Sequence, residues 1–334
     1  MVGRAAALPM ADSSPPAGPS ASSLQSSLHG ATRTLHNQLN VGIISRLPKC
    51  LPPHASDPTA YHLGIITYGQ IFVALELGID RVLSGPLQGP VARERQVRIL
   101  KTLHTAGLAR TRKLKHDTNT LSSRILSRKD PSSADALRQI EEKVRADADA
   151  RTRYVTERIE QNPYLALAYA WTMYLALFNG GRHIQRALKR PGREFWLTEN
   201  DTGSDEIDVL SFWHFEAATE EDPEADQLRL EFKSRCDKAC QLLTDCEREG
   251  VIKEAEGIFE LCMELVLFLD GVMVEYEHQA QSIVSRTEDK RKPPRASAGG
   301  TWYDTMSSAI APVGKFLGLD RRRPLVEGLK DEDH

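Results

Sequence analysis

Apolar residues recur every three to four positions along most of the chain, a spacing that predicts amphipathic helices. Sustained alternation of apolar and polar residues, which would indicate strands, is not found in any run. The expected fold class is therefore all-α, with a single multi-helical domain over residues 23–284. The helices predicted within it span residues 24–38, 58–84, 91–106, 110–127, 135–161, 163–189, 223–248 and 250–283.

Several segments differ in composition from the rest of this helical part. Residues 1–22 are rich in Ser, Pro and Ala, so a disordered N-terminal tail is expected. A highly charged segment near residues 126–150 is expected to form an exposed helix or an insertion. Residues 285–334 are expected to be a linker and a C-terminal tail. Within that tail, residues 302–319 predict a short amphipathic segment that either contacts a membrane surface or packs on its own domain.

The composition of the 334-residue chain argues against several classes of function. The formal net charge of -3 gives no basic face for nucleic acid, so no nucleic-acid partner is expected. The longest apolar run, Tyr164 to Phe178, is shorter than the roughly 20 residues that span a bilayer, so no transmembrane segment is expected. Five cysteines without a recognisable spacing favour free thiols in a reducing compartment.

The stretch ATRTLHNQLN, residues 31–40, places a histidine beside the apolar stripe of the first predicted helix. Leu28, Leu35 and Leu39 share that stripe, and His36 lies next to Leu35. A histidine in this position is either a hydrogen-bonded residue at the edge of the core or a ligand held for something inside the fold. The stripe alone leaves both interpretations open.

A second candidate lies in the apolar helix that begins near Tyr164, because Asn179, Gly180 and Gly181 interrupt it before the helical pattern resumes. Each glycine within a helix costs roughly 1 kcal/mol relative to alanine. The pair therefore indicates a kink, or a close approach of the backbone to a flat ligand; the alternative is that one helix ends there and a turn begins another. Together with His36, an interrupted facing helix would form a heme pocket with one protein ligand.

Other metal motifs are incomplete. Glu275 and His278 have the Glu-x-x-His spacing of a di-iron bundle, but no second copy occurs, so exposed charge accounts for them better. Cys236 and Cys240 lie one turn apart without the further ligands of a zinc site. No phosphate-binding loop, dinucleotide glycine fingerprint or nucleophile elbow is present.

Several segments, taken in order, resemble the heme oxygenase family. They include LHGATRTLHNQLN, YLALFNGGRHIQRAL and VIKEAEGIFELCMEL, and the resemblance covers most of residues 24–270. It implies oxidative cleavage of heme to biliverdin, CO and iron, with heme as both substrate and cofactor. It also implies O2 as oxidant and electrons from NADPH through a flavoprotein reductase, which would be a partner.

The resemblance assigns roles to individual residues. His36 matches the histidine that ligates the heme iron, and Gly180 and Gly181 match the glycine pair that lies over the heme. Tyr68 matches a tyrosine of the hydrogen-bond network on the distal side, and Asn179 is a further candidate for proton delivery there.

Three basic residues are similarly assigned to the heme propionates: Arg33, Arg229 and Lys233. Cations at the mouth of a pocket suit this role because they pair with the two carboxylates and orient the ring.

The chain also departs from the family pattern at the distal helix. Leu177 stands in place of an aspartate, Met173 in place of an arginine, and Ala176 in place of a glycine. On the proximal side, Asn40 replaces a glutamate and His29 replaces a lysine. A leucine side chain cannot anchor the water chain that the aspartate holds, whereas an asparagine can still accept a hydrogen bond from the proximal imidazole.

Two function hypotheses therefore stand beside the heme oxygenase activity. The first is a non-catalytic heme-binding protein on the same fold, acting as a sensor, carrier or buffer. The second, a thiaminase-like helical enzyme without heme, is disfavoured because no nucleophile stands near Gly180. Many family members carry a C-terminal transmembrane anchor, and no such span is found here. The expected location is the cytoplasm, with peripheral association with the endoplasmic reticulum through residues 302–319 as an alternative.

Overall fold

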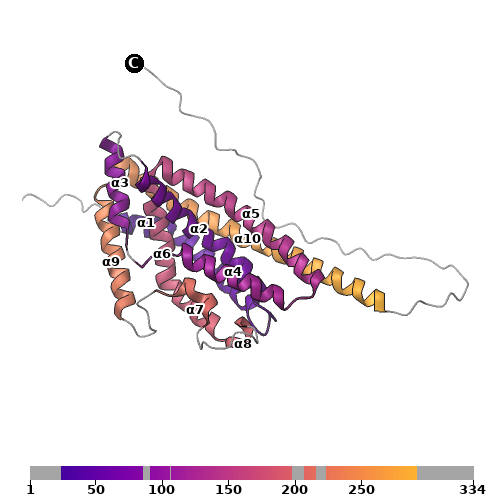
Figure 1. Cartoon of the computed structure of the whole chain (residues 1–334). Helices are drawn as coiled ribbons and strands as arrows, with labels where there is room; N and C mark the ends of the chain where they lie inside the picture. The colour runs from indigo at the N-terminus through magenta and orange to yellow at the C-terminus, as the bar shows by residue number, and fades with distance from the viewer. Residues whose placement is uncertain (1–23, 86–90, 106, 198–206, 216–222, 292–334) are drawn as a thin grey trace, which may run out of the picture. The chain divides into compact units, whose positions relative to one another are not determined.

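The structure, a computed structural model, describes residues 24–85, 91–105, 107–197, 207–215 and 223–291 (Figure 1). Within these ranges the chain contains helices and connecting turns but no strand, which confirms the all-α fold class. The helices are α1 (Leu24–Arg46), α2 (Thr59–Ser84), α3 (Val91–Leu103), α4 (Thr111–Ser127), α5 (Pro131–Gln161), α6 (Ala166–Ala176), α7 (Arg182–Lys189), α8 (Arg193–Trp196), α9 (Pro223–Cys240) and α10 (Asp245–Arg291). Shorter helical segments are η1 (Leu47–Cys50), η2 (Pro163–Leu165), η3 (Leu177–Gly181) and η4 (Asp208–Trp213). The expected N-terminal tail and the amphipathic segment 302–319 lie outside the described residues.

Helix α2 is the centre of the core, because apolar side chains surround it rather than forming one stripe. Two glycines allow neighbouring helices to approach it closely. A Cβ atom added at Gly69 would lie 2.5 Å from Leu114 of α4, and one added at Gly78 would lie 3.0 Å from Ile159 of α5. These positions therefore require glycine for packing.

Among the described helices, α2 is also the one long and apolar enough to cross a membrane by length and composition. However, 61% of its most apolar window is buried inside the structure. Packing against α4, α5 and α6 accounts for its apolar character.

The charged segment near residues 126–150 contributes the first half of α5 and packs along α2. Its buried residues Ile140, Val144 and Ala148 join Leu63 and Ile66 of α2 in one apolar cluster. The charged residues between them cover the outer side of the helix, which is why their density suggested an exposed helix or an insertion in the sequence.

Two charged residues, the half-buried Glu76 and the buried Arg110, hold the loops beside α4. The Glu76 carboxylate of α2 accepts hydrogen bonds from the backbone N–H groups of Arg110 (2.6 Å) and Thr111 (3.1 Å), at the N-terminus of α4. The fully buried Arg110 guanidinium donates to the carbonyl of His214 (2.6 Å) and lies 4.2 Å from the centre of the Phe215 ring. This pair therefore ties residues 207–215 to the core.

Asp117 of α4 fixes the position of η4. Its carboxylate accepts hydrogen bonds from the Ser211 hydroxyl (2.6 Å) and the Phe212 backbone N–H (2.7 Å). Burial raises the pKa of Asp117 to about 6, although these hydrogen bonds oppose the rise. The neighbouring Trp213 is thereby held 3.5 Å from the position of a Cβ at Gly181.

Helix α9 ends at Cys240 and α10 begins at Asp245, so the single helix expected over residues 223–248 is wrong. A capping box starts α10: the Thr244 backbone N–H donates to the Glu247 carboxylate (2.9 Å), and the Glu247 N–H donates to the Thr244 hydroxyl (3.3 Å). The sequence Thr-Asp-Cys-Glu carried this signal.

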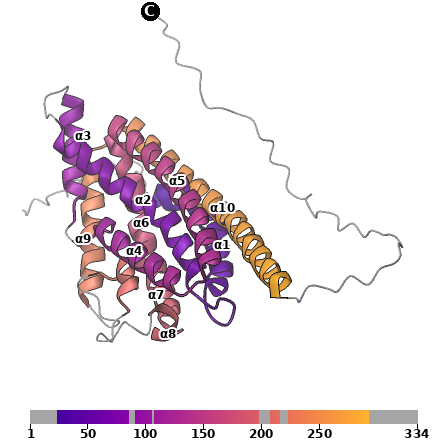
Figure 2. The same ribbon diagram turned by 45° about the vertical axis from the view of Figure 1, so that its right-hand side comes forward.

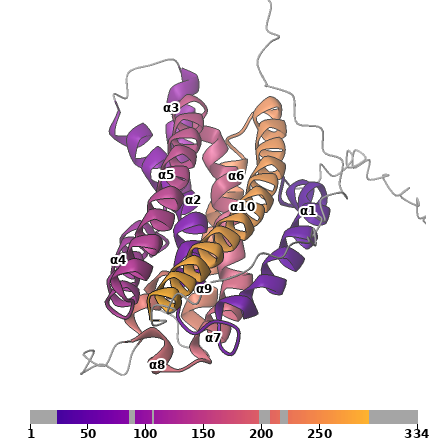
Figure 3. The same cartoon turned by 90° about the vertical axis from the view of Figure 1, so that its right-hand side faces the viewer.

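Helix α1 lies alongside α10, as Figures 2 and 3 both show. Near its end the Arg46 guanidinium pairs with Asp270 of α10 (Nε to Oδ1, 2.7 Å). A Cβ at Gly42 would lie about 4 Å from Val266. Only Leu24, Leu28 and Thr32 of α1 are buried. Much of this helix therefore remains available for the cleft described next.

Candidate functional site

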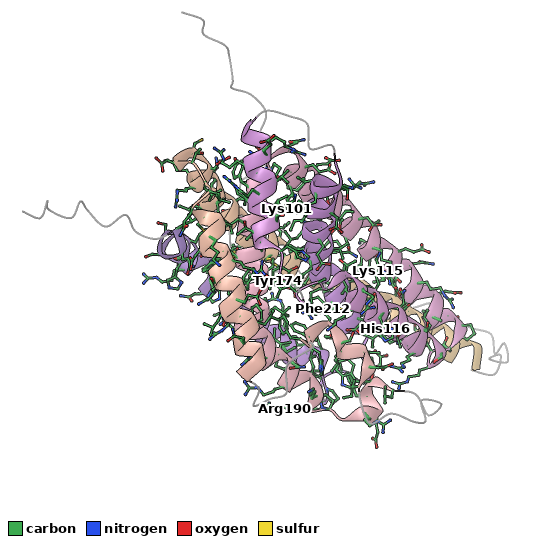
Figure 4. The ribbon with its side chains drawn as sticks, turned by 60° about the vertical axis from the view of Figure 1, so that its left-hand side comes forward. Lys101, Lys115, His116, Tyr174, Arg190 and Phe212 are labelled. Atoms are coloured by element: carbon green, nitrogen blue, oxygen red, sulfur yellow. The ribbon has the colours of Figure 1, made fainter. Side chains whose placement is uncertain are left out.

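A cleft of about 1500 Å³ lies between α1 and the helical stretch formed by α6, η3 and α7. Lys233 of α9 and Phe259 of α10 complete its lining. The volume exceeds the ~300–1,000 Å³ of common small-molecule pockets, so the cleft suits a large ligand. Figure 4 shows the Arg190 end of this stretch and, in the interior, Tyr174 and Phe212, both of which contact Phe72 (ring centres 5.5 and 5.3 Å apart).

Each wall presents side chains at helical spacing. From α1 and the start of η1 the cleft receives His29, Arg33, His36, Asn40, Ile43 and Leu47. From the facing stretch and its end it receives Thr172, Leu175, Ala176, Asn179, Gly180, His183, Ala187 and Arg190. Positions three and four apart fall on one face of a helix, so helix geometry explains which residues of each helix line the cleft.

The interruption expected at the glycine pair takes the form of a π-helical segment, η3, from Leu177 to Gly181. The chain remains helical through it, with φ -58° and ψ -37° at Gly181, so the alternative of a turn between two helices is wrong. Single π turns within α-helices are frequent at functional sites.

The two glycines have different surroundings. No atom lies within 4 Å of a Cβ built on Gly180, which lines the cleft. A Cβ on Gly181 would lie 3.1 Å from Leu177 and 3.5 Å from Trp213, on the buried side. Gly180 therefore exposes backbone to a ligand, whereas Gly181 serves the packing of the wall and does not line the cleft.

His36 is exposed to the cleft and is not a core histidine. Its ring meets Phe259 edge to face, with ring centres 5.8 Å apart and planes at 82°. Asn40 lines the cleft one helical turn later, on the same side as His36. His36 is therefore not buried in the core, and its imidazole faces the cleft.

The expected cations are only partly brought together. Arg33 and Lys233 line the cleft from α1 and α9. Arg229 does not, but its guanidinium donates to the Asn179 side-chain oxygen at 3.2 Å, so it reaches the wall through that amide. Arg190, which was not singled out in the sequence, lines the cleft beyond α7.

Tyr68 lies outside the cleft lining. Its hydroxyl donates to the backbone carbonyl of Cys262 on α10 at 3.0 Å, and burial raises the pKa of Tyr68. The structure thus places this tyrosine between α2 and α10.

The positions that depart from the family pattern divide between core and cleft. Leu177 and Met173 are buried, and neither lines the cleft. Ala176, His29 and Asn40 do line it. An apolar side chain at Leu177 contributes to packing of the wall and offers nothing polar to a ligand.

The cleft residues that were not recognised from the sequence as site residues include Trp171, Thr172 and His183. His183 follows Gly180 by three positions and Asn179 by four, which is the spacing of one helical face. That spacing was the available signal. The Thr172 hydroxyl oxygen is buried and has no hydrogen-bond partner among the described residues.

Metal sites built from clustered side chains do not occur in the part of the chain that the structure describes. No group of three or more His, Cys, Asp or Glu residues comes together there. Glu275 pairs with Lys143 of α5, and the five cysteines are free thiols, as expected.

These features define an all-helical protein with a large cleft that has an imidazole on one wall and an open glycine on the other. The chain belongs to the heme oxygenase family, whose sequence profile matches residues 82–267, more than half of the chain. The matched residues include η3 and α9 but not α1. The match therefore does not cover His36, whose position at the site follows from the cleft lining alone.

Individual relatives are distant. The chain is 26% identical over 244 residues to the heme-binding protein HMX1 of Saccharomyces cerevisiae, covering 70% of this chain and 71% of that protein. The crystal structure of heme oxygenase-1 from the cyanobacterium Synechocystis sp. PCC6803, in complex with heme, is similar in fold with a TM-score of 0.51 and 18% identity. That similarity covers 81% of this chain and all of the cyanobacterial one, and it supports the all-α fold.

Proposed function

We propose that the protein binds heme in the cleft through His36 and cleaves it oxidatively to biliverdin, CO and iron. O2 is the oxidant, and an NADPH-dependent flavoprotein reductase supplies the electrons. The observation that carries the proposal is the exposed imidazole of His36 and the open backbone of Gly180 on opposite walls of one cleft, in a member of the heme oxygenase family. When bound, heme supplies the iron that activates O2 and the ring that is oxidised.

The residues present fit this ligand. Leu39, Ile43 and Ile184 give the cleft apolar surface for a flat ring. The absence of a side chain at Gly180 leaves space against the wall, since no atom lies within 4 Å of its Cβ position.

The chain's own residues have separable tasks in this proposal. His36 would hold the iron through a ring nitrogen, and the edge-to-face contact with Phe259 restricts rotation of its imidazole. Arg33 and Lys233 pair with the two propionates and orient the ring. Asn179, which accepts a hydrogen bond from Arg229, presents its amide beside Gly180.

A second candidate function, heme binding without catalysis, has one structural observation in its favour. None of the described residues that line the cleft is acidic, and Leu177 is buried away from it. A wall without a carboxylate lacks the usual anchor for a proton-delivering water chain. The yeast relative is itself named a heme-binding protein.

The test of binding is a hemin titration of the full chain, followed by the Soret absorption band. Wild-type protein should give a sharp band, and His36→Ala should weaken or shift it because the nitrogen that would hold the iron is lost. His278→Ala is the matched control, since His278 is exposed on α10 and does not line the cleft. A spectrum of His36→Ala that equals wild type would contradict the assignment of His36.

The test of catalysis is a single turnover of the hemin complex with ascorbate, or with reductase and NADPH. Loss of the Soret band with growth of a bile-pigment absorption supports cleavage. Release of intact heme, or a complex that remains unchanged under reductant and O2, supports the non-catalytic function.

A further inference from the structure

The cleft has an unusual set of charged groups. Its described lining contains no acidic residue, so the groups there that carry or change charge are Arg33, Arg190, Lys233, His29, His36 and His183. Among these, only the imidazoles belong to a side-chain type that gains or loses a proton near neutral pH. Proton exchange by the cleft walls therefore depends on histidine.

His183 is the imidazole on the wall opposite His36. It lies on α7, is exposed, and shares the cleft-facing stripe of Asn179 and Gly180. At 1.5 Å per residue it is about 4.5 Å along the helix from Gly180. Arg190 lies seven residues further, about 10 Å away along the stretch. His183 is thus the ionisable side chain of this wall nearest to the open glycine.

The other polar groups of this wall cannot take the same role. Thr172 and Asn179 can form hydrogen bonds but do not change charge near neutral pH. The Asn179 oxygen, moreover, already accepts from Arg229 at 3.2 Å. His29 lies on α1, so it faces the cleft from the same wall as His36.

We infer that His183 is the acid–base residue of the cleft, donating a hydrogen bond from α7 to a small anion or oxygen-bearing ligand held on the face of the heme away from His36. This inference rests on the proposed heme binding. The family pattern has a carboxylate at the position of Leu177, on the turns that precede His183. In this chain Leu177 is buried and Ala176 is apolar, so His183 is the ionisable group on this part of the wall.

The probe is fluoride binding to the hemin-loaded full chain, followed by absorption. Fluoride accepts hydrogen bonds, so a donor beside it increases its affinity. His183→Leu should weaken fluoride binding roughly 10-fold or more, as expected for loss of a hydrogen bond to a charged partner. His183→Gln should recover part of the affinity because an amide N–H can donate. His278→Leu should match wild type.

The pH profile separates an acid–base residue from a fixed donor. Wild-type affinity relative to His183→Gln should fall as pH rises through the range in which imidazoles lose their proton. The other titratable or charged groups facing the cleft are unchanged in both proteins; they are His29, Arg33, His36, Arg190 and Lys233. Their contributions therefore cancel in the comparison.

The outcomes separate this inference from the proposed function. If hemin gives no Soret band, the proposed function fails. If hemin binds but fluoride affinity and its pH profile are the same in wild type, His183→Leu and His183→Gln, the inference is overturned. It is also overturned if wild type shows iron with two nitrogen ligands and His183→Leu removes one, because His183 would then be an iron ligand.

Discussion

Helices α1 and α2 have similar lengths but opposite roles. Three of the 23 residues of α1 are buried, whereas fourteen of the 26 residues of α2 are. Helix α2 contributes the core contacts, and α1 presents a stripe that contains His36 to the cleft. Ligand-binding elements are commonly those with the fewest buried contacts, because they must remain able to adjust. The fold thus separates the helix that contributes most to the core from the helix that lines the cleft.

The largest predicted effect tests this separation with one type of substitution. Leu75→Ala in α2, where Leu75 is fully buried, should lower the free energy of unfolding by about 2–5 kcal/mol through lost burial and cavity formation. Leu39→Ala in α1, where Leu39 is half-buried in the cleft wall, should cost roughly 1 kcal/mol or less. Urea unfolding of the hemin-free protein measures both, and equal losses would show that α1 is packed as firmly as α2.

The second prediction concerns Glu141, which joins α5 to α2. Burial alone would raise its pKa, but His62 of α2 (3.3 Å), together with Arg145 and Ser122, lowers the pKa of Glu141 to about 2 from 4.5. A lowered folded-state pKa adds stability above the unfolded pKa, and this stability is lost as pH falls toward 2. Glu141→Gln should cost roughly 3 kcal/mol at pH 7, and less as the pH is lowered.

Urea unfolding between pH 3 and pH 7 measures this dependence. Glu142→Gln is the matched control, since Glu142 is the next residue and is exposed. It should change stability by no more than about 0.5 kcal/mol. A Glu141→Gln deficit that is constant over this pH range would show that the ionised carboxylate does not stabilise the contact between α5 and α2.

The smallest predicted effect compares two glycines. Gly180→Ala should raise the stability of the hemin-free protein by about 0.5–1 kcal/mol, because alanine favours helix and the Cβ meets no atom within 4 Å. It should also weaken hemin binding, since the methyl group projects into the cleft. Gly78→Ala should lower stability, because its Cβ would lie 3.0 Å from Ile159. Thermal unfolding and hemin titration measure these changes, and shifts of the same sign in both variants would contradict the contrast.

Much of the fold could be predicted from the sequence because apolar spacing is a local property. The apolar residues of α2 indicated a mostly buried helix, and that helix is the core of the structure. The charged first half of α5 was harder to interpret, since Ile140 and Val144 pack against α2 while charged neighbours dominate the composition. The Thr244 capping box was visible in the sequence but was overlooked within a continuous helical pattern.

The candidate site could be predicted only in part, because a cleft depends on which elements face one another. His36 and Gly180 were recognised from local features, and the structure places both in the cleft. His183 was not, because its helical spacing from Asn179 and Gly180 was a weak signal in a segment of basic residues. Tyr68 was expected at the site but lies between α2 and α10, where the partner of its hydroxyl is a backbone carbonyl.

The excess of positive side chains in the cleft affects both the rate of ligand entry and the rate of product release. Arg33, Lys233 and Arg190 create a positive potential that no acidic residue of the described lining offsets. Such a field accelerates the encounter with a dicarboxylate and makes that encounter sensitive to ionic strength. In the proposed reaction, opening of the ring would leave both carboxylates of the product in place, so the cations that attract the substrate would also retain the product. If the proposed cleavage takes place, departure of the bile pigment, rather than capture of heme, is the step that these cations slow.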